Sequence, residues 1–354
     1  MAVEEVGAVG AVGAARAMGD VETVGVLGNV REVETVKTAG ALGDVERGAF
    51  TGVIVAMNSC YDAQDRVNAE AAARLARWLV DKGVNGLYVG GGTGEGVLQS
   101  AEERKAILEA VVRECSGQTT VIAHVGAATT EDSVSLAEHA ADIGADAISA
   151  IPPFYYSYSE DAVKRHWLAI MDSAPLPFII YNVPAATGFS MSTELLREMC
   201  ADERLLGIKT TSFSTYELQQ FKAIGGDNFH VFNGPDQQYL AGRVMGASGG
   251  IGGTYGAMPE LFIAIEQAYL RGDIRAAQHW QVVVNRFITE IRELGLFGTI
   301  KELVRLRGID CGLPRLPLAR LNEQQVPRVH ALYEEIMAEV EKAADEVGEG
   351  AFRG

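Results

Sequence analysis

The sequence predicts an α/β protein, a (β/α)8 TIM barrel with extra C-terminal helices. The first observation is that short apolar runs alternate with amphipathic stretches from Phe50 onward. The second is that eight such runs occur, at spacings of roughly 20–35 residues that leave room for a helix between strands. A doubly wound open sheet is the alternative, but it usually has fewer units and a nucleotide-binding fingerprint.

The apolar runs are typical of buried strands, and the stretches between them have helical periodicity. The predicted strands cover residues 50–57, 86–90, 120–126, 147–153, 178–184, 205–210, 229–234 and 248–253. The clearest predicted helices cover residues 68–83, 100–115 and 129–145. The second of these opens with Ser100 and has Glu103 three residues later, which is the pattern of a capping box.

The two ends of the chain differ from the barrel region. Residues 273–295 and 324–348 have helical periodicity and predict helices packed on the barrel. Residues 1–48 consist mainly of Val, Gly, Ala and acidic residues, and their closely spaced glycines break helix and strand patterns. An interaction arm is possible there, but a weakly ordered extension is favoured. The predicted regions are therefore 1–48 (extension), 49–272 (barrel) and 273–354 (C-terminal helices).

Composition excludes several classes of protein. The chain has 354 residues and a formal net charge of −17, which argues against nucleic acid and anionic membranes as partners. It has no continuous apolar stretch of the ~18–20 residues that a membrane span needs. The four cysteines form no C-x-x-C pair, so free thiols are expected. Because the N-terminus also lacks a basic signal region, we expect a cytoplasmic protein.

In a barrel of this type the reactive residues lie at the carboxyl ends of the strands. The predicted sixth strand ends in Lys209, which should project into the barrel mouth. A solvated charge or a structural ion pair is the ordinary explanation. The other is chemistry, because a partly desolvated amine is a nucleophile toward carbonyl groups.

Other strand ends favour the second explanation. The turn GGGTGEG at residues 90–96, with Gly92, Thr93 and Gly94, exposes backbone N–H groups and suits a carboxylate, although it is also typical of a tight turn. It lacks the Walker pattern of nucleotide sites. Residues 152–159 follow two prolines with three tyrosines that either relay protons or simply pack.

The last two strands and the histidines add further expectations. Asp236, after the seventh strand, can accept hydroxyls of a polyol, and the glycines around Gly253 leave room for a bulky substrate. The histidines have no metal-ligand spacing, since His124, His139 and His166 lie on different elements. We therefore predict no metal.

The motifs at these strand ends resemble a known family. In chain order they are YVGGGTGE, PPFYY, YNVPAATG, GIKTT, NGPD and GGIGGTY. They are similar to the N-acetylneuraminate lyase / dihydrodipicolinate synthase family of class I pyruvate aldolases, over roughly residues 50–320. The first motif and the fourth-strand region resemble the sialic acid lyases in particular.

The resemblance implies a role for each motif. Lys209 corresponds to the lysine that forms a Schiff base with the keto group of pyruvate, and Tyr156 to the tyrosine that relays protons. Thr93 and its neighbours correspond to the holder of the pyruvate carboxylate. Thr211, Gly234 and Asp236 correspond to positions that bind the sugar-derived portion.

Three residues depart from the family pattern. Gly92 and Gly253 stand where serine is expected, and Gln237 stands where glutamate is expected. Gln237 and Gly253 belong to the substrate-binding part that reads sugar hydroxyls, so they put the aldehyde partner in question. The synthase branch is disfavoured because residues 155–158 lack the arginine that grips a second carboxylate there.

The resemblance implies a lyase of carbohydrate metabolism that reversibly splits N-acetylneuraminate into pyruvate and N-acetylmannosamine. It implies no cofactor beyond the covalent Schiff base on Lys209, a small-molecule 2-keto acid as substrate, and a homotetramer. A sister aldolase for another 2-keto-3-deoxy sugar acid is the first alternative. A sensor that binds pyruvate-like ligands without turnover is the second.

Overall fold

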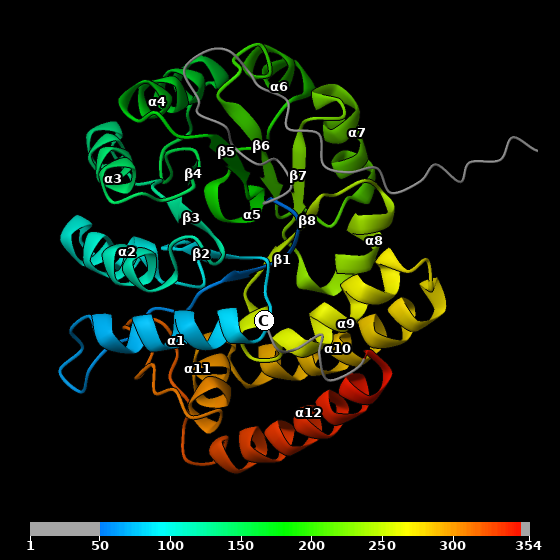
Figure 1. Cartoon of the computed structure of the whole chain (residues 1–354). Helices are drawn as coiled ribbons and strands as arrows, with labels where there is room; N and C mark the ends of the chain where they lie inside the picture. Colours follow the sequence, from blue (N-terminus) through cyan, green and yellow to red (C-terminus); the bar gives the residue numbers. More distant parts are fainter. Residues whose placement is uncertain (1–49, 348–354) are drawn as a thin grey trace, which may run out of the picture. The chain divides into compact units, whose positions relative to one another are not determined.

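The computed structural model describes residues 50–347, so the predicted extension at 1–48 lies outside the described residues. Eight parallel strands close into a barrel in chain order (Figure 1). The strands are β1 (Gly52–Ala56), β2 (Gly86–Val89), β3 (Thr120–His124), β4 (Ala147–Ala150), β5 (Phe178–Asn182), β6 (Leu205–Thr210), β7 (His230–Asn233) and β8 (Gly249–Gly252). Each lies within one predicted apolar run, so the predicted TIM barrel is confirmed.

Helices surround the barrel on its outer side (Figure 1). They are α1 (Ala69–Asp81), α2 (Ala101–Cys115), α3 (Thr130–Asp142), α4 (Glu160–Ser173), α5 (Pro184–Thr187), α6 (Thr193–Met199), α7 (Thr215–Gly225), α8 (Tyr239–Val244) and α9 (Pro259–Leu270). The capping box predicted for α2 is present, since Ser100 Oγ accepts from the Glu103 N–H and the Glu103 carboxylate accepts from the Ser100 N–H. It satisfies two backbone donors at the start of the helix.

Three further helices follow the barrel: α10 (Ile274–Leu294), α11 (Leu296–Leu306) and α12 (Val326–Val347). They lie together on one side of the barrel, next to α9 (Figure 1). The chain turns between α10 and α11 at Gly295, whose φ of 109° favours glycine. No separate helix was predicted for the α11 region, whereas α10 and α12 match predicted helices closely.

The core has two layers because successive side chains of a strand point to opposite faces. The inner layer fills the barrel with Phe50, Ile54, Ala56, Tyr88, Ile122, Ala147, Ile179, Phe232 and Ile251. The outer layer packs the strands against the helices. Both faces of each strand are therefore buried, which explains the continuous apolar runs in the sequence.

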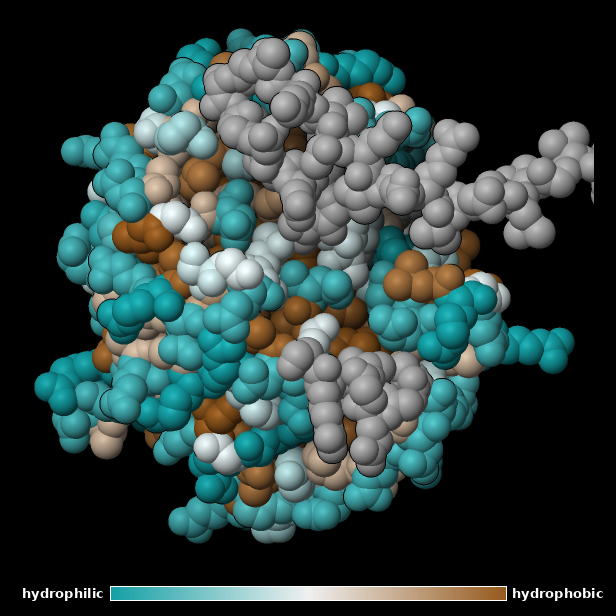
Figure 2. Space-filling view, in the orientation of Figure 1, coloured by the Kyte–Doolittle hydropathy of each residue, from teal (hydrophilic) through white to brown (hydrophobic). Residues whose placement is uncertain are grey.

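The described part of the face drawn in Figure 2 is largely hydrophilic. Figure 2 shows hydrophobic side chains near the middle of the face seen in Figure 1, with mostly hydrophilic ones around them. No helix within residues 50–347 is long and apolar enough to cross a membrane. All four cysteines are free, as expected from the sequence.

Candidate active site

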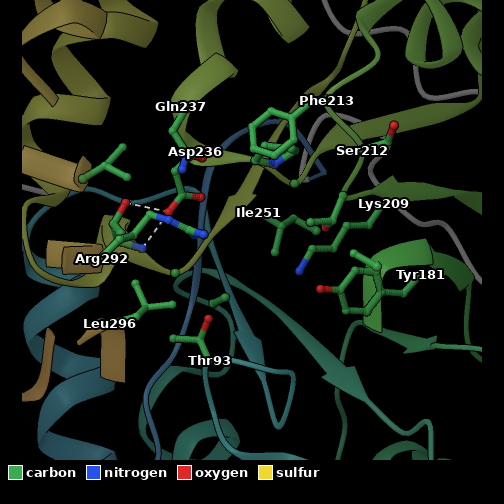
Figure 3. Close-up of a pocket in the computed structure, with 18 of the residues that line it drawn as sticks. Thr93, Tyr181, Lys209, Ser212, Phe213, Asp236, Gln237, Ile251, Arg292 and Leu296 are labelled. Carbon is green, nitrogen blue, oxygen red and sulfur yellow. Dashed lines mark hydrogen bonds between the residues drawn. The ribbon is translucent and has the colours of Figure 1, made fainter. Parts of the chain in front are cut away.

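A cavity of about 530 Å³ opens at the carboxyl ends of the strands. Residues at or just after the ends of β2, β5, β6, β7 and β8 line it, and Ile288, Arg292 and Leu296 close one wall (Figure 3). A volume of this size is within the range of small-molecule sites. The cavity therefore occupies the place where a barrel of this type carries its reactive groups.

Lys209 lies deep in this cavity, near the end of β6. Its side chain is 4% exposed, and its amine lies 4.0 Å from the ring centre of Tyr181 and 4.4 Å from that of Tyr88. The amine makes no hydrogen bond or ion pair within the described part of the chain. The ordinary explanation of Lys209 as a structural ion pair is therefore contradicted, and no side chain of the described residues occupies the amine.

Tyr181 is the tyrosine that the fold brings to Lys209. It lies on β5 directly opposite Lys209 in the strand register, so both side chains point into the barrel at the same level. The Tyr181 hydroxyl and the Lys209 amine lie next to each other in the cavity (Figure 3). A phenol in this position can move a proton to or from atoms bound to the lysine.

The structure does not place Tyr156 in the cavity, and its catalytic role stays a prediction. Its side chain is 68% exposed and does not line the cavity; its ring packs edge-on against Tyr155 and Tyr158. Because β4 ends at Ala150, the segment that follows carries Tyr156 beyond the barrel mouth, and Tyr155 has a positive φ of 82°. Sequence reasoning chose this tyrosine pair from its position after a strand and passed over the tyrosine inside the next strand.

Thr93 is the residue of the glycine-rich turn that reaches the cavity. Its hydroxyl and backbone N–H, together with the N–H of Gly94, donate no hydrogen bond within residues 50–347. Neither Gly92 nor Gly94 lines the cavity, and a Cβ built on Gly92 would touch nothing. The turn therefore presents unpaired donors to the cavity through Thr93, and its use as a carboxylate site stays a prediction.

A buried ion pair between Glu95 and Lys301 helps to hold the turn at residues 90–96 in place. Glu95, which adopts the left-handed region at φ 56°, places its carboxylate 2.6 Å from the amine of Lys301 on α11. The same carboxylate accepts a hydrogen bond from the Arg315 N–H at 2.8 Å. Both partners of the ion pair are almost fully buried. The C-terminal helices therefore help to fix the position of Thr93.

Thr211 and Gly234 lie together on the wall beside Lys209. The Thr211 hydroxyl is buried and has no hydrogen-bond partner among the described residues. A Cβ at position 234 would collide with that hydroxyl, so glycine is required for the close approach. The hydroxyl is unpaired but covered, so the substrate-binding role expected for this pair stays a prediction.

Asp236, Gln237 and Gly253 also line the cavity, as predicted. Asp236 accepts hydrogen bonds from the Thr254 N–H at 2.8 Å and the Thr254 hydroxyl at 2.5 Å. Burial raises the pKa of Asp236, while the bonds from Thr254 and the charge of Lys209 act in the opposite direction. Both Thr254 bonds go to Oδ2, and Oδ1 lies against Gly252, where an added Cβ would collide with it.

His124, at the end of β3, packs edge-on against Tyr181 with ring centres 5.9 Å apart. Burial, followed by the charges of Arg104 and Lys209, lowers the pKa of His124 well below its ordinary value. The ring is therefore neutral and adds no second cation beside Lys209. Within residues 50–347 no three His, Cys, Asp or Glu side chains form a metal-ligand set, and the absence of a metal stays a prediction.

The fold and site together define a (β/α)8 barrel with a buried, unpaired lysine at its mouth, an arrangement suited to covalent chemistry through an amine. Residues 49–336 match the family model described as the dihydrodipicolinate synthetase family. The chain belongs to this family.

Individual relatives are similar over most of the chain. An N-acetylneuraminate lyase of Mediterraneibacter gnavus is 39% identical over 281 residues, 78% of this chain and 89% of that protein. An N-acetylneuraminate lyase of Salmonella agona is 36% identical over 82% of this chain and 98% of its own length. The structure of wild-type Ruminococcus gnavus sialic acid aldolase has 38% sequence identity and a TM-score of 0.81, covering 83% of this chain and 99% of that one.

Proposed function

We propose that the protein is a class I, lysine-dependent aldolase that reversibly cleaves N-acetylneuraminate to pyruvate and N-acetylmannosamine. The observation that carries the proposal is the unpaired amine of Lys209, buried beside the Tyr181 hydroxyl. Relatives named N-acetylneuraminate lyase, with identities of 36–39% over most of the chain, support this substrate.

The proposed reaction begins when the Lys209 amine attacks the C2 keto carbon of the open-chain substrate. Loss of water gives a protonated Schiff base, which draws electrons from the neighbouring bonds. Removal of the proton from the C4 hydroxyl then breaks the C3–C4 bond and releases the sugar aldehyde. The remaining enamine takes a proton at C3, and water hydrolyses the Schiff base to free pyruvate and Lys209.

In this proposal Tyr181 moves the protons, because its hydroxyl is the phenol that lies beside the lysine amine in the cavity. Thr93 holds the carboxylate through its free hydroxyl and N–H. The Asp236 carboxylate accepts hydrogen bonds from hydroxyls of the sugar-derived portion, and the Thr211 hydroxyl donates to or accepts from them. Gly234 leaves room for the Thr211 hydroxyl. Holding the keto acid at both ends keeps C2 within reach of the amine.

A sister aldolase for another 2-keto-3-deoxy sugar acid is the second candidate. The observation that favours it is the change in the substrate-reading part of the cavity, where Gln237 is neutral and Gly253 has no hydroxyl. A site that lacks groups to pair substrate hydroxyls discriminates less among sugars.

Pyruvate release across a panel of nonulosonates and shorter 2-keto-3-deoxy acids tests the proposed function. Among the unphosphorylated members we expect N-acetylneuraminate to have the highest kcat/KM. If only a shorter keto-deoxy acid is cleaved, the sister aldolase is the correct assignment. A protein that binds pyruvate but turns over no member of the panel would be a sensor.

Restoring the residues expected at positions 237 and 253 should have unequal effects. We expect Gln237→Glu to lower KM for N-acetylneuraminate, by about 5- to 100-fold if one buried pairing is regained at ~1–3 kcal/mol. Gly253→Ser should instead raise KM, because a Cβ at 253 lies 2.5 Å from Thr93 Oγ1 and forces that hydroxyl to turn. Steady-state kinetics of both single variants, with Gly253→Ala as the control for the clash alone, measure this.

If Gly253→Ser lowers KM as strongly as Gln237→Glu does, the Thr93 hydroxyl is not the holder of the carboxylate. An increase in KM for Gln237→Glu would mean that the cavity binds the sugar in another orientation.

The remaining parts of the proposal concern partners and location. The proposal includes no cofactor other than the Schiff base on Lys209 and no metal. A homotetramer and a cytoplasmic location stay predictions. Light scattering of the purified full chain measures the mass of the particle, and a mass other than four chains would contradict the tetramer.

A further inference from the structure

Arg292 lies on the cavity wall across from the proposed reacting group. It is in the last turn of α10, one turn after Ile288, and both line the cavity together with Leu296, the first residue of α11. In Figure 3 this wall is on the opposite side of the cavity from Lys209 and Tyr181. A substrate fixed at Lys209 by its keto end therefore extends toward Arg292 with its far end.

The Arg292 guanidinium has no partner within residues 50–347. It makes no ion pair or side-chain hydrogen bond there. The residues three and four positions before it on α10 are Thr289 and Ile288, neither of which is acidic, and α10 ends at Leu294. Arg286 on the same helix and Arg328 on α12 both reach carboxylates, whereas Arg292 does not.

The charges of the cavity are not balanced by its own residues. Its lining holds two cations, Lys209 and Arg292, and one carboxylate, Asp236, which already accepts two hydrogen bonds from Thr254. The carboxylate of a 2-keto acid accounts for one cation at the Lys209 end. At the other end Gln237 is neutral, so the positive charge of Arg292 remains for the ligand.

We propose that Arg292 is a specificity-determining residue that binds a phosphate monoester at the far end of a 2-keto-3-deoxy sugar acid. The planar guanidinium can donate two parallel hydrogen bonds to phosphate oxygens. This inference rests on the proposed aldolase function and names the class of substrate that the site takes most readily. The alternative is that Arg292 only interacts with the carbonyl end of the α10 dipole.

Matched substrate pairs test the inference with the full chain. One pair is N-acetylneuraminate and its 9-phosphate; the other is 2-keto-3-deoxygluconate and its 6-phosphate. We expect the wild type to prefer the phosphorylated member of at least one pair by about tenfold or more in kcat/KM, the size typical of a charge-assisted hydrogen bond. The preference should lie mainly in KM and should weaken as salt is added.

Three arginine variants show whether the preference for phosphorylated substrates depends on the guanidinium of Arg292 or on a general effect on the structure of α10. Arg292→Gln should raise KM much more for the phosphorylated member than for the unphosphorylated one and so remove the preference, and Arg292→Lys should keep part of it. Arg275→Gln, an exposed arginine on the same helix that does not line the cavity, should keep all of it. A wild type that cleaves both members of each pair equally, or an Arg292→Gln variant that keeps the preference, overturns the inference.

Binding measured without turnover distinguishes failure of the inference from failure of the aldolase proposal. Titration calorimetry with glycerol 3-phosphate, which carries the same terminal group, should give binding that Arg292→Gln weakens about tenfold or more. If no keto acid is cleaved but this binding is present and depends on Arg292, the phosphate site stands and the aldolase proposal fails. If the binding is absent or does not depend on Arg292, the phosphate site is wrong.

Discussion

Replacing Lys209 by methionine should abolish pyruvate release from every substrate that the wild type cleaves. Methionine keeps the length of the side chain and packs against the rings of Tyr88 and Tyr181, so the fold should be retained. The amine is the proposed nucleophile, and loss of a covalent nucleophile typically costs on the order of 10⁴- to 10⁶-fold in kcat. A coupled pyruvate assay with a sensitive end point measures the residual rate.

The matched control is Lys164→Met, which removes a partly buried lysine outside the cavity that pairs with Glu198. It should retain wild-type kcat. Circular dichroism and thermal unfolding of both variants show whether each is folded. If folded Lys209→Met retains more than a small fraction of the activity, the amine of Lys209 is not the nucleophile.

Tyr181→Phe should lower kcat by about 10²- to 10⁴-fold, the usual contribution of a positioned proton donor or acceptor. The phenyl ring still packs against His124 and Lys209, so the geometry of the lysine should change little. Formation of the Schiff base should persist in part, because the amine remains. Single-turnover kinetics separate formation of the adduct from cleavage of the C3–C4 bond.

Tyr156→Phe is the comparison that decides between the two tyrosines. The exposed side chain of Tyr156 lies outside the cavity, so we expect its loss to reduce kcat much less than the loss of the Tyr181 hydroxyl. If the two variants show the opposite order, protons move through Tyr156, as the family resemblance implied. Activity of Tyr181→Phe within about twofold of wild type, well below the range for acid–base catalysis, would remove Tyr181 from the mechanism.

Local sequence signals were sufficient for the barrel because each strand and each cap depends on residues close together in the chain. The eight apolar runs contain the eight strands, and the Ser100 capping box forms as predicted. Lys209 could be predicted for a similar reason. It is a charged residue near the end of an apolar run, and the barrel fold fixes where such ends meet.

Tyr181 could not be chosen from the sequence without the register of the strands. Tyr181 lies within the apolar run FIIYNVP, where a tyrosine is usually a packed core residue. The pair Tyr155–Tyr156 follows two prolines and is therefore more conspicuous in the sequence. The signal that could have found it is the alternation of side chains between the two faces of a strand. Because Ile179 points into the barrel, Tyr181, two positions later, does so as well. The pairing of Tyr181 with Lys209 then follows from neighbouring parallel strands.

Contacts between distant segments were beyond the reach of local patterns. Glu95 and Lys301 are far apart in the chain, and nothing near either residue indicates their buried ion pair. Arg292 likewise belongs to a helix that was predicted only as packing on the barrel. Its place on the cavity wall depends on how α10 and α11 sit against the ends of β7 and β8.

The covalent adduct on Lys209 is the most direct test of the mechanism. The full chain is incubated with pyruvate and borohydride, digested, and mapped by mass spectrometry. We expect the mass of one reduced three-carbon unit on Lys209, loss of activity in proportion to labelling, and no labelling of Lys209→Met. A label on another lysine, or none under conditions where the enzyme turns over, would contradict the central claim that this buried, unpaired amine captures the keto group.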